Sequence, residues 1–120
     1  MAEHNDLGRY GEALARAYLE AKGYRILEQN WKYGRAEVDL IAFDGERIVF
    51  VEVKTRRSAD HGEPDEFVGW KKEKQLEFAS QAYIERHQFE GEIRFDIIGI
   101  VFKNKDLYKI NHIEDAFWPT

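Results

Sequence analysis

The pattern of apolar and polar positions predicts two helices. Between Leu7 and Lys22 apolar residues recur at helical spacing, and Gly23 can end that helix. A second helical pattern covers Glu66–His87. Both helices carry polar residues on the opposite side of the apolar stripe, which favours packing of each helix against another layer.

Short apolar segments rich in Val, Ile, Leu and Phe predict the strands. They cover Tyr24–Trp31, two runs within Val38–Arg57, Glu92–Phe102 and Leu107–Ile113. The two runs within Val38–Arg57 flank Asp44-Gly45, a pair typical of hairpin turns because Gly tolerates positive φ. The element order α-β-β-β-α-β-β favours an α/β fold, with a central mixed β-sheet flanked by two long α-helices.

The hairpin carries acidic and basic residues on an otherwise apolar background. Glu52 and Lys54 lie on one face of the second run, because alternate residues of a strand point to opposite faces. Glu37 and Asp39 share a face of the first run, and the hairpin can bring Asp39 opposite Glu52 and Lys54. Carboxylates held close together are costly unless a counter-ion neutralises them. The pattern therefore predicts a site for a hard divalent cation.

Mg²⁺ or Mn²⁺ is the expected ion, because carboxylate oxygens are the ligands that Mg²⁺ prefers. Asp39 and Glu52 are the expected ligands, with the backbone carbonyl of Val53 as a third. Lys54 would orient or help deprotonate a metal-bound water, or stabilise negative charge in the transition state of phosphodiester hydrolysis. Glu-x-Lys alone is a weak signal, and the Asp on the preceding strand makes it more specific.

Glu12 is a further candidate acid, at the margin of the first helix's apolar stripe. It could hold the metal through water or bind a second metal. The alternative is an ordinary helix-surface pair with Arg16, four residues on, worth a few tenths of a kcal/mol. Glu37 is an alternative accessory carboxylate.

The net charge of -5 argues against a protein that binds nucleic acid by bulk charge. Basic residues nevertheless cluster after the central strand and at the start of the second helix: Lys54, Arg56, Arg57, Lys71, Lys72 and Lys74. They would form a basic rim around the acidic centre or, alternatively, a solvated surface. Lys72 and Gln75 fall within the second helix's apolar stripe, so this end of the helix is expected to overhang the carboxylates. The alternative is that Lys72 extends to water and Gln75 satisfies a backbone group.

Composition excludes several classes of protein. A chain of 120 residues is expected to form one domain, 1–120. The sequence has no Cys, which excludes disulfides, thiolate zinc sites and thiol catalysis and fits a reducing cytoplasm. No apolar run reaches the about 18 residues of a membrane span. The irregular segment Ser58–Asp65 is a candidate substrate-facing flap.

Five stretches of the chain carry a resemblance to known proteins. They are L-G-R-Y-G-E-A-L-A-R-A-Y-L-E-A-K-G-Y-R-I-L-E-Q-N-W (7–31), A-E-V-D-L-I-A (36–42), V-F-V-E-V-K-T-R (49–56), G-E-P-D-E-F-V-G-W-K-K-E-K (62–74) and R-F-D-I-I-G-I (94–100). They resemble the YraN-like family of small bacterial proteins, and this resemblance implies membership of the restriction-endonuclease-like, PD-(D/E)XK nuclease superfamily and similarity to the archaeal Holliday-junction resolvases. The resemblance implies a restriction-endonuclease-like core.

The superfamily's metal-binding pattern falls on four residues of this chain: Glu12, Asp39, Glu52 and Lys54. Two positions depart from the usual pattern. Ala36 stands where the family usually has Gly, and Val38 replaces the Pro that names the superfamily motif, which is ordinary for this subfamily.

The function expected from residues and resemblance together is a metal-dependent endonuclease acting on DNA, with branched or recombination intermediates as candidate substrates. The alternative is a non-catalytic nucleic-acid-binding or protein-interaction module on the same fold. A third interpretation is a structural partner in a larger complex, contacting it through the tail around Phe117 and Trp118. Dimers are common among nucleases that cut two strands, so a homodimer is compatible with the sequence, which leaves the oligomeric state open.

Overall fold

The computed structural model describes the backbone of residues 2–58 and 70–118 and the side chains of residues 7–58 and 72–118. Its elements are α1 (Ala2–Ala21), β1 (Arg25–Tyr33), β2 (Ala36–Phe43), β3 (Ile48–Arg57), α2 (Trp70–His87), β4 (Ile93–Asn104) and β5 (Leu107–Ile113). The predicted order α-β-β-β-α-β-β is confirmed. Most of the candidate flap Ser58–Asp65, the first residues expected in the second helix (66–69) and the side chain of Lys71 lie outside the described residues.

The first helix is longer than its apolar stripe. α1 begins at Ala2 rather than Leu7, because its first turn is polar and gives no periodic signal. Its end is as predicted: Gly23 has φ +94°, and the Tyr24 N–H donates to the Leu19 carbonyl at 3.0 Å. This bond closes a Schellman motif, in which glycine supplies the left-handed residue that stops the helix.

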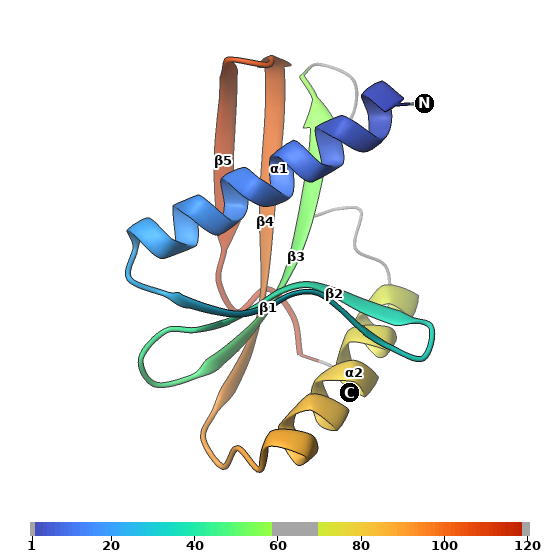
Figure 1. Ribbon diagram of the computed structural model, residues 1–120, viewed down its shortest axis with the longest axis vertical. Coiled ribbons are helices and arrows are strands. Elements are labelled where there is room, and N and C mark those ends of the chain that lie inside the picture. The colour runs from blue at the N-terminus through green and yellow to red at the C-terminus, as the bar shows by residue number, and fades with distance from the viewer. Residues whose placement is uncertain (1, 59–69, 119–120) are drawn as a thin grey trace.

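The five strands form one mixed sheet in the order β1-β2-β3-β4-β5 (Figure 1). β3 and β4 are parallel and are connected through α2, whereas the other neighbouring pairs are antiparallel. The class expected from the sequence is therefore correct: an α/β protein with a mixed sheet and two helices. Between β2 and β3, Gly45 has φ +102° and the Asp44 carboxylate accepts the Glu46 and Arg47 N–H groups.

The sheet carries an apolar layer on each face. On one face Ala15 and Leu19 of α1 pack with Val51 of β3. On the other face Leu76 of α2 packs with Phe50 of β3. Because residues alternate along β3, Glu52 and Lys54 fall on the α2 side of the sheet.

α1 lies close to β3 at a glycine. A Cβ atom at Gly11 would overlap the methyl group of Thr55, so only glycine permits this approach. The neighbouring residue on the helix is Glu12. Glycine at this position thus brings the Glu12 backbone toward the strand that carries Glu52.

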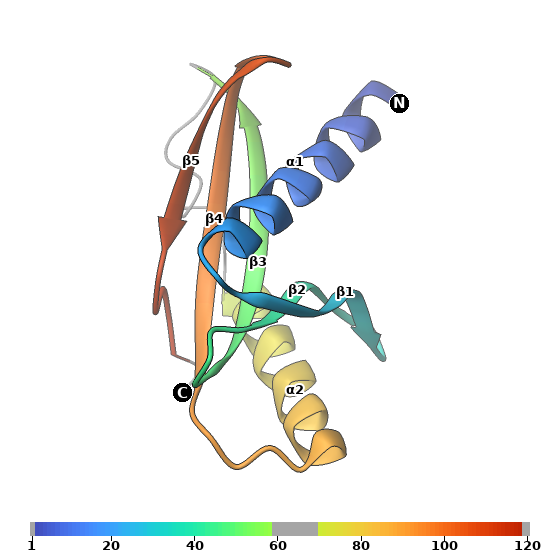
Figure 2. The same ribbon diagram turned by 60° about the vertical axis from the view of Figure 1, so that its left-hand side comes forward.

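The pairing between β2 and β3 ends early. Its last pair is Leu40 with Val51, whereas β1 and β2 stay paired as far as Tyr33 and Ala36. The outer part of the β1–β2 hairpin therefore extends away from the rest of the sheet (Figure 2). β2 therefore separates from β3 between Leu40, its last paired residue, and Asp39. The candidate site lies at this separation.

Candidate metal centre

Asp39 replaces a missing backbone partner where β2 leaves β3. The Val53 N–H donates to Asp39 Oδ2 at 2.8 Å, so a carboxylate takes the place of a ladder carbonyl. The N–H and C=O of one residue in an antiparallel ladder face the same neighbouring strand. We therefore expect the Val53 carbonyl to point toward the same gap, beside Asp39.

Glu52 is buried next to Asp39 with incomplete partners. Its relative exposure is 5 %, and its Oε1 atom has no hydrogen-bond partner among the residues that the structure describes. Lys72 Nζ lies 3.5 Å from Oε1 and Lys54 Nζ lies 3.8 Å from Oε2. Both separations suit an ion pair but are long for a hydrogen bond. The expectation that the start of the second helix overhangs the carboxylates is confirmed for Lys72, whose ammonium group lies at Glu52 while its side chain stays 30 % exposed.

The charges of Lys54 and Lys72 do not offset the effect of burial on the carboxyl groups of Asp39 and Glu52. Burial and the nearby Asp39 carboxylate raise the pKa of Glu52 to about 7, although Lys72 and Lys54 act to lower it. Burial also raises the pKa of Asp39, against the hydrogen bond from Val53 and the charges of the same two lysines. Both shifts mean that the folded protein resists ionising these acids. An additional cation would relieve that cost.

Glu12 of α1 belongs to the same electrostatic cluster. Burial raises its pKa, the Asp39 carboxylate raises it further, and a hydrogen bond from Asn30 lowers it. Arg16 instead bonds Glu20 at 3.2 Å and Gln29 at 3.0 Å. The alternative pairing of Glu12 with Arg16 is therefore wrong.

Asn30 was missed by sequence reasoning. The strand register pairs Gln29 with Leu40 and Trp31 with Val38, so Asn30 stands opposite Asp39. Asn30 has φ 55°, a left-handed conformation that Asn adopts more readily than most residues. An Asn inside an otherwise strand-like segment was the signal that could have indicated it.

Glu37 lies at the edge of this cluster. It is half-buried, and its carboxylate raises the pKa of Asp39 and of Glu12. That influence places it near both acids, as expected of an accessory carboxylate.

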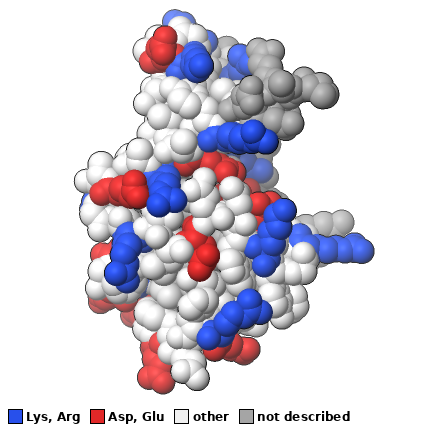
Figure 3. Space-filling view, in the orientation of Figure 1, with Lys and Arg blue, Asp and Glu red and all other residues white. Residues whose placement is uncertain are grey.

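The predicted basic rim divides into separate groups. Lys54 and Lys72 lie at Glu52, while Lys74 is exposed, 3.8 Å from Glu77. The remaining candidates are placed as follows: Arg56 donates to the Thr55 carbonyl at 3.0 Å, Arg57 is exposed on the α1 side, and Gln75 is exposed. Gln75 was expected within the apolar stripe, which is wrong, because the buried side of α2 is formed by Leu76, Ala79 and Tyr83. Figure 3 shows acidic side chains in the middle of one face, bordered by Lys and Arg.

The donor set at the centre fits Mg²⁺ or Mn²⁺. Among the described residues, no group of three or more His, Cys, Asp and Glu side chains is arranged to hold a metal by itself. Two carboxylates and one carbonyl are nevertheless sufficient for Mg²⁺, which keeps several of its waters. The buried Glu52 Oε1 atom, which has no hydrogen-bond partner in the described part of the chain, is the kind of oxygen that a hard cation would bind.

Comparison with known proteins identifies the family. The model of the family described as "Uncharacterised protein family UPF0102" matches residues 11–100. The chain belongs to this family. This confirms the YraN-like assignment, and the matched range contains Glu12, Asp39, Glu52 and Lys54.

Curated members of the family match almost the whole chain. A UPF0102 protein of Christiangramia forsetii is 50 % identical over 118 residues, which cover 98 % of both chains. Another, of Bacteroides thetaiotaomicron, is 43 % identical over 119 residues, covering 99 % of this chain and 98 % of the relative. In the part of the chain that the structure describes, no helix is both long and apolar enough to cross a membrane.

Proposed function

We propose that the protein is a Mg²⁺- or Mn²⁺-dependent nuclease with a restriction-endonuclease-like core. One observation carries the proposal: a buried Glu52, incompletely paired among the described residues, lies beside Asp39 where β2 leaves β3. A buried carboxylate without a full set of partners is destabilising, so its presence calls for a ligand. Perturbed acids gathered at one point of a fold are typical of functional sites.

Asp39, Glu52 and the Val53 carbonyl would hold the ion, with Glu12 contributing through water. A bound divalent ion supplies Lewis acidity and lowers the pKa of its water to near neutrality. Asp39 is oriented by the Val53 N–H through one carboxylate oxygen, and its other oxygen would bind the ion. Glu52 lies close enough for the Asp39 charge to raise its pKa, so both acids could bind one ion.

Lys54 and Lys72 would bind the substrate phosphate. Both ammonium groups lie within ion-pair distance of Glu52, one from β3 and one from α2. When Glu52 coordinates a cation, these lysines are attracted to it less strongly and can bind phosphate oxygens. Lys54 would additionally orient the attacking water or stabilise the charge that develops on the phosphate.

DNA is the proposed substrate, with branched or recombination-type structures the first to test. Because the net charge is -5, binding would depend on local cations rather than on the overall field. A homodimer would provide a second centre for a second strand. The absence of Cys fits action in a reducing cytoplasm.

A cleavage assay tests the proposal directly. Wild-type protein is incubated with single strands, duplexes, flaps, forks and four-way junctions in Mg²⁺, Mn²⁺ or EDTA. Lys54→Ala runs alongside, and Lys109→Ala serves as the matched control because Lys109 is an exposed lysine on β5. We expect metal-dependent cutting by wild type and Lys109→Ala, and a loss of at least about 100-fold in Lys54→Ala.

Metal binding, measured by calorimetry with Mn²⁺, separates the contrary outcomes. Binding that Asp39→Ala abolishes, without cutting of any substrate, would favour the non-catalytic nucleic-acid-binding or protein-interaction module. Undiminished Mn²⁺ affinity in Asp39→Ala would show that the metal centre is wrongly assigned.

A further inference from the structure

A cavity lies on the α1 side of the sheet, near the ends of β3 and β4. Its volume is about 740 Å³, within the range of small-molecule sites. Its lining includes Leu7, Tyr10, Arg57, Phe102, Lys103 and Lys105. In Figure 1 this is the upper end of the molecule, where the first half of α1 lies near the tips of the strands.

The floor of this cavity is aromatic and fixed in position. Phe102 is 2 % exposed, and the Tyr10 ring stacks on it with centroids 5.7 Å apart and planes 27° apart. The Tyr10 hydroxyl donates to the Lys105 carbonyl at 3.3 Å. Tyr10 itself remains partly exposed, and the Lys105 ammonium group lies over its ring, 6.0 Å from the centroid, so a planar ligand would have to displace this flexible side chain to stack there.

The rim of the cavity is cationic. Arg57 ends β3, Lys103 lies near the end of β4, and Lys105 lies in the turn after it. All three residues are exposed, and the described lining contains no Asp or Glu. The nearby Asp106 is exposed and uses its N–H to close the turn on Asn104. Basic side chains are visible at this upper end of the molecule in Figure 3.

We propose that this cavity, the Tyr10 pocket, binds one nucleotide unit. Its phosphate would contact Arg57, Lys103 and Lys105, and its base would lie against Tyr10. Stacking on an aromatic ring beside a basic rim is how proteins bind single-stranded nucleic acid with little sequence preference. An acidic protein that gathers three cations around one aromatic floor favours an anionic, planar ligand. The unit belongs either to a single strand or to a free mononucleotide.

The Tyr10 pocket is separate from the candidate metal centre. Arg57 lies five positions beyond Glu52 on β3, about 17 Å along the strand. The pocket is on the α1 side, whereas Glu52 faces α2. The inference rests on the proposed function only in taking nucleic acid as a source of the nucleotide: the pocket would hold a single-stranded segment away from the scissile bond.

Fluorescence anisotropy with a labelled ten-nucleotide oligo-dT, in EDTA, tests the pocket without any cleavage. We expect the double variant Lys103→Glu/Lys105→Glu to weaken binding at least tenfold and to reduce the salt slope by about 0.7 for each phosphate that it no longer neutralises. The matched control, Lys32→Glu/Lys109→Glu, makes the same change in net charge at two exposed lysines outside the pocket. Equal weakening by both pairs would overturn the proposal.

The aromatic contact is tested in the same assay with Tyr10→Leu, which keeps an apolar side chain over Phe102. We expect at least fivefold weaker binding to oligo-dT, and no change with an abasic strand of equal length. An unchanged affinity for oligo-dT in folded Tyr10→Leu protein would overturn the assignment of a nucleotide. Competition by millimolar thymidine monophosphate would identify the free mononucleotide as a sufficient ligand, whereas competition by unlabelled strand alone would identify the polymer.

The two proposals fail in different ways. Binding of oligo-dT in EDTA that depends on Tyr10 and Lys103 supports the pocket even if no substrate is ever cut. Metal-dependent cutting with unchanged binding in the pocket variants supports the nuclease and overturns the pocket.

Discussion

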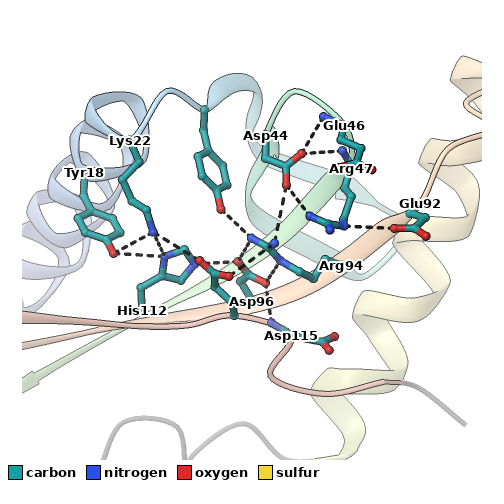
Figure 4. Close-up of polar contacts among 12 residues, drawn as sticks. Tyr18, Lys22, Asp44, Glu46, Arg47, Glu92, Arg94, Asp96, His112 and Asp115 are labelled. Atoms are coloured by element: carbon teal, nitrogen blue, oxygen red, sulfur yellow. Dashed lines mark hydrogen bonds and ion pairs between the residues drawn. The ribbon is translucent and has the colours of Figure 1, made fainter.

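Two buried polar clusters on the same sheet differ in how completely their charges are paired. The first is the candidate metal centre around Glu52, and the second contains Arg94, Asp96 and His112 (Figure 4). Each includes an acidic and a basic residue two positions apart on an apolar strand, Glu52 with Lys54 and Asp96 with Arg94. The same sequence pattern therefore produces an electrostatically strained site in one place and a satisfied network in the other.

Every oxygen of the Asp96 carboxylate has partners. Arg94 donates to both oxygens at 2.9 Å, and the Asp115 N–H donates to Oδ1 at 3.0 Å. His112 Nε2 lies 2.7 Å from Oδ2. Burial alone would raise the pKa of Asp96, but the bonds from His112, Arg94 and Asp115 outweigh it and lower the pKa. This network joins β4 to β5 and to the segment after β5.

The comparison shows that burial alone does not distinguish a well-paired acid from a poorly paired one. Glu52 and Asp96 are both buried on central strands, yet their pKa values shift in opposite directions. The difference lies in the partners: a bidentate guanidinium, an imidazole and a backbone N–H for Asp96, but, among the described residues, two ammonium groups at 3.5 and 3.8 Å for Glu52. We therefore expect substitutions to lower stability at Asp96 and to raise it at Glu52.

The largest expected effect is the loss of stability in Asp96→Asn. The amide keeps the shape but removes the charge, which leaves the buried Arg94 guanidinium with its hydrogen bond to the Tyr24 hydroxyl at 2.7 Å and only the longer ion pairs to Asp44 and Glu114 at 3.7 Å. We expect a decrease of about 3 kcal/mol in the free energy of unfolding, measured with urea at pH 7.5. Asp115→Asn is the control, because Asp115 contributes its backbone N–H to the network, and it should change stability by less than about 0.5 kcal/mol.

An Asp96→Asn protein as stable as wild type would mean that the two clusters do not differ as described. Because the pKa of Asp96 is lowered in the folded state, its contribution is present above the unfolded pKa and is lost as pH falls through the folded value. The stability difference between wild type and Asp96→Asn should accordingly shrink in strongly acidic solution.

Most of the fold was predictable because it depends on local periodicity. The apolar alternation in β3 and the glycine after α1 are local signals, and the predicted range Leu107–Ile113 agrees with β5. The start of α1 at Ala2 was not predictable, because its first residues lack an apolar stripe. The periodic pattern of apolar residues predicts a helix or strand only where that segment buries one of its faces.

The candidate site was most predictable where its residues shared a hairpin, whereas the positions of Glu12 and Lys72 were left open between two alternatives. Asp39 and Glu52 are neighbours through the β2–β3 connection, so alternation and turn chemistry were sufficient to bring them together. The Asp96 network was missed, because its partners His112 and Asp115 come from β5 and the segment beyond it. An acidic and a basic residue on one strand do not indicate which other elements of the fold will supply their remaining hydrogen-bond partners.

After the loss expected in Asp96→Asn, the second-largest expected effect is a gain in stability in Glu52→Gln at pH 8. The amide removes a buried carboxylate whose pKa is raised to about 7, so it should increase the free energy of unfolding by about 1–3 kcal/mol. Because the folded protein holds this proton more tightly than the unfolded chain, wild-type stability decreases as pH rises from about 4.5 to about 7. The gain in Glu52→Gln should therefore fade by pH 5.

Thermal unfolding at pH 5 and pH 8 measures this difference, with the exposed Glu46→Gln as a control that should change little. Mn²⁺ added at pH 8 should raise the melting temperature of wild type and leave that of Glu52→Gln unchanged, because the ion stabilises only a protein that binds it. A Glu52→Gln protein less stable than wild type at pH 8 would show that Lys54 and Lys72 fully compensate the buried charge.

The smallest effect is expected for Lys72→Met, which separates the two roles of the lysine. Methionine keeps an apolar stem on α2 but removes the ammonium group 3.5 Å from Glu52. At pH 8.5, where Glu52 is ionised, removal of a repelling charge should tighten Mn²⁺ binding by about fivefold. The same change should weaken binding to DNA, because methionine cannot pair with a phosphate. Calorimetry with Lys109→Met as control measures the first effect, and weaker Mn²⁺ binding in Lys72→Met would mean that Lys72 positions Glu52 for the metal rather than competing with it.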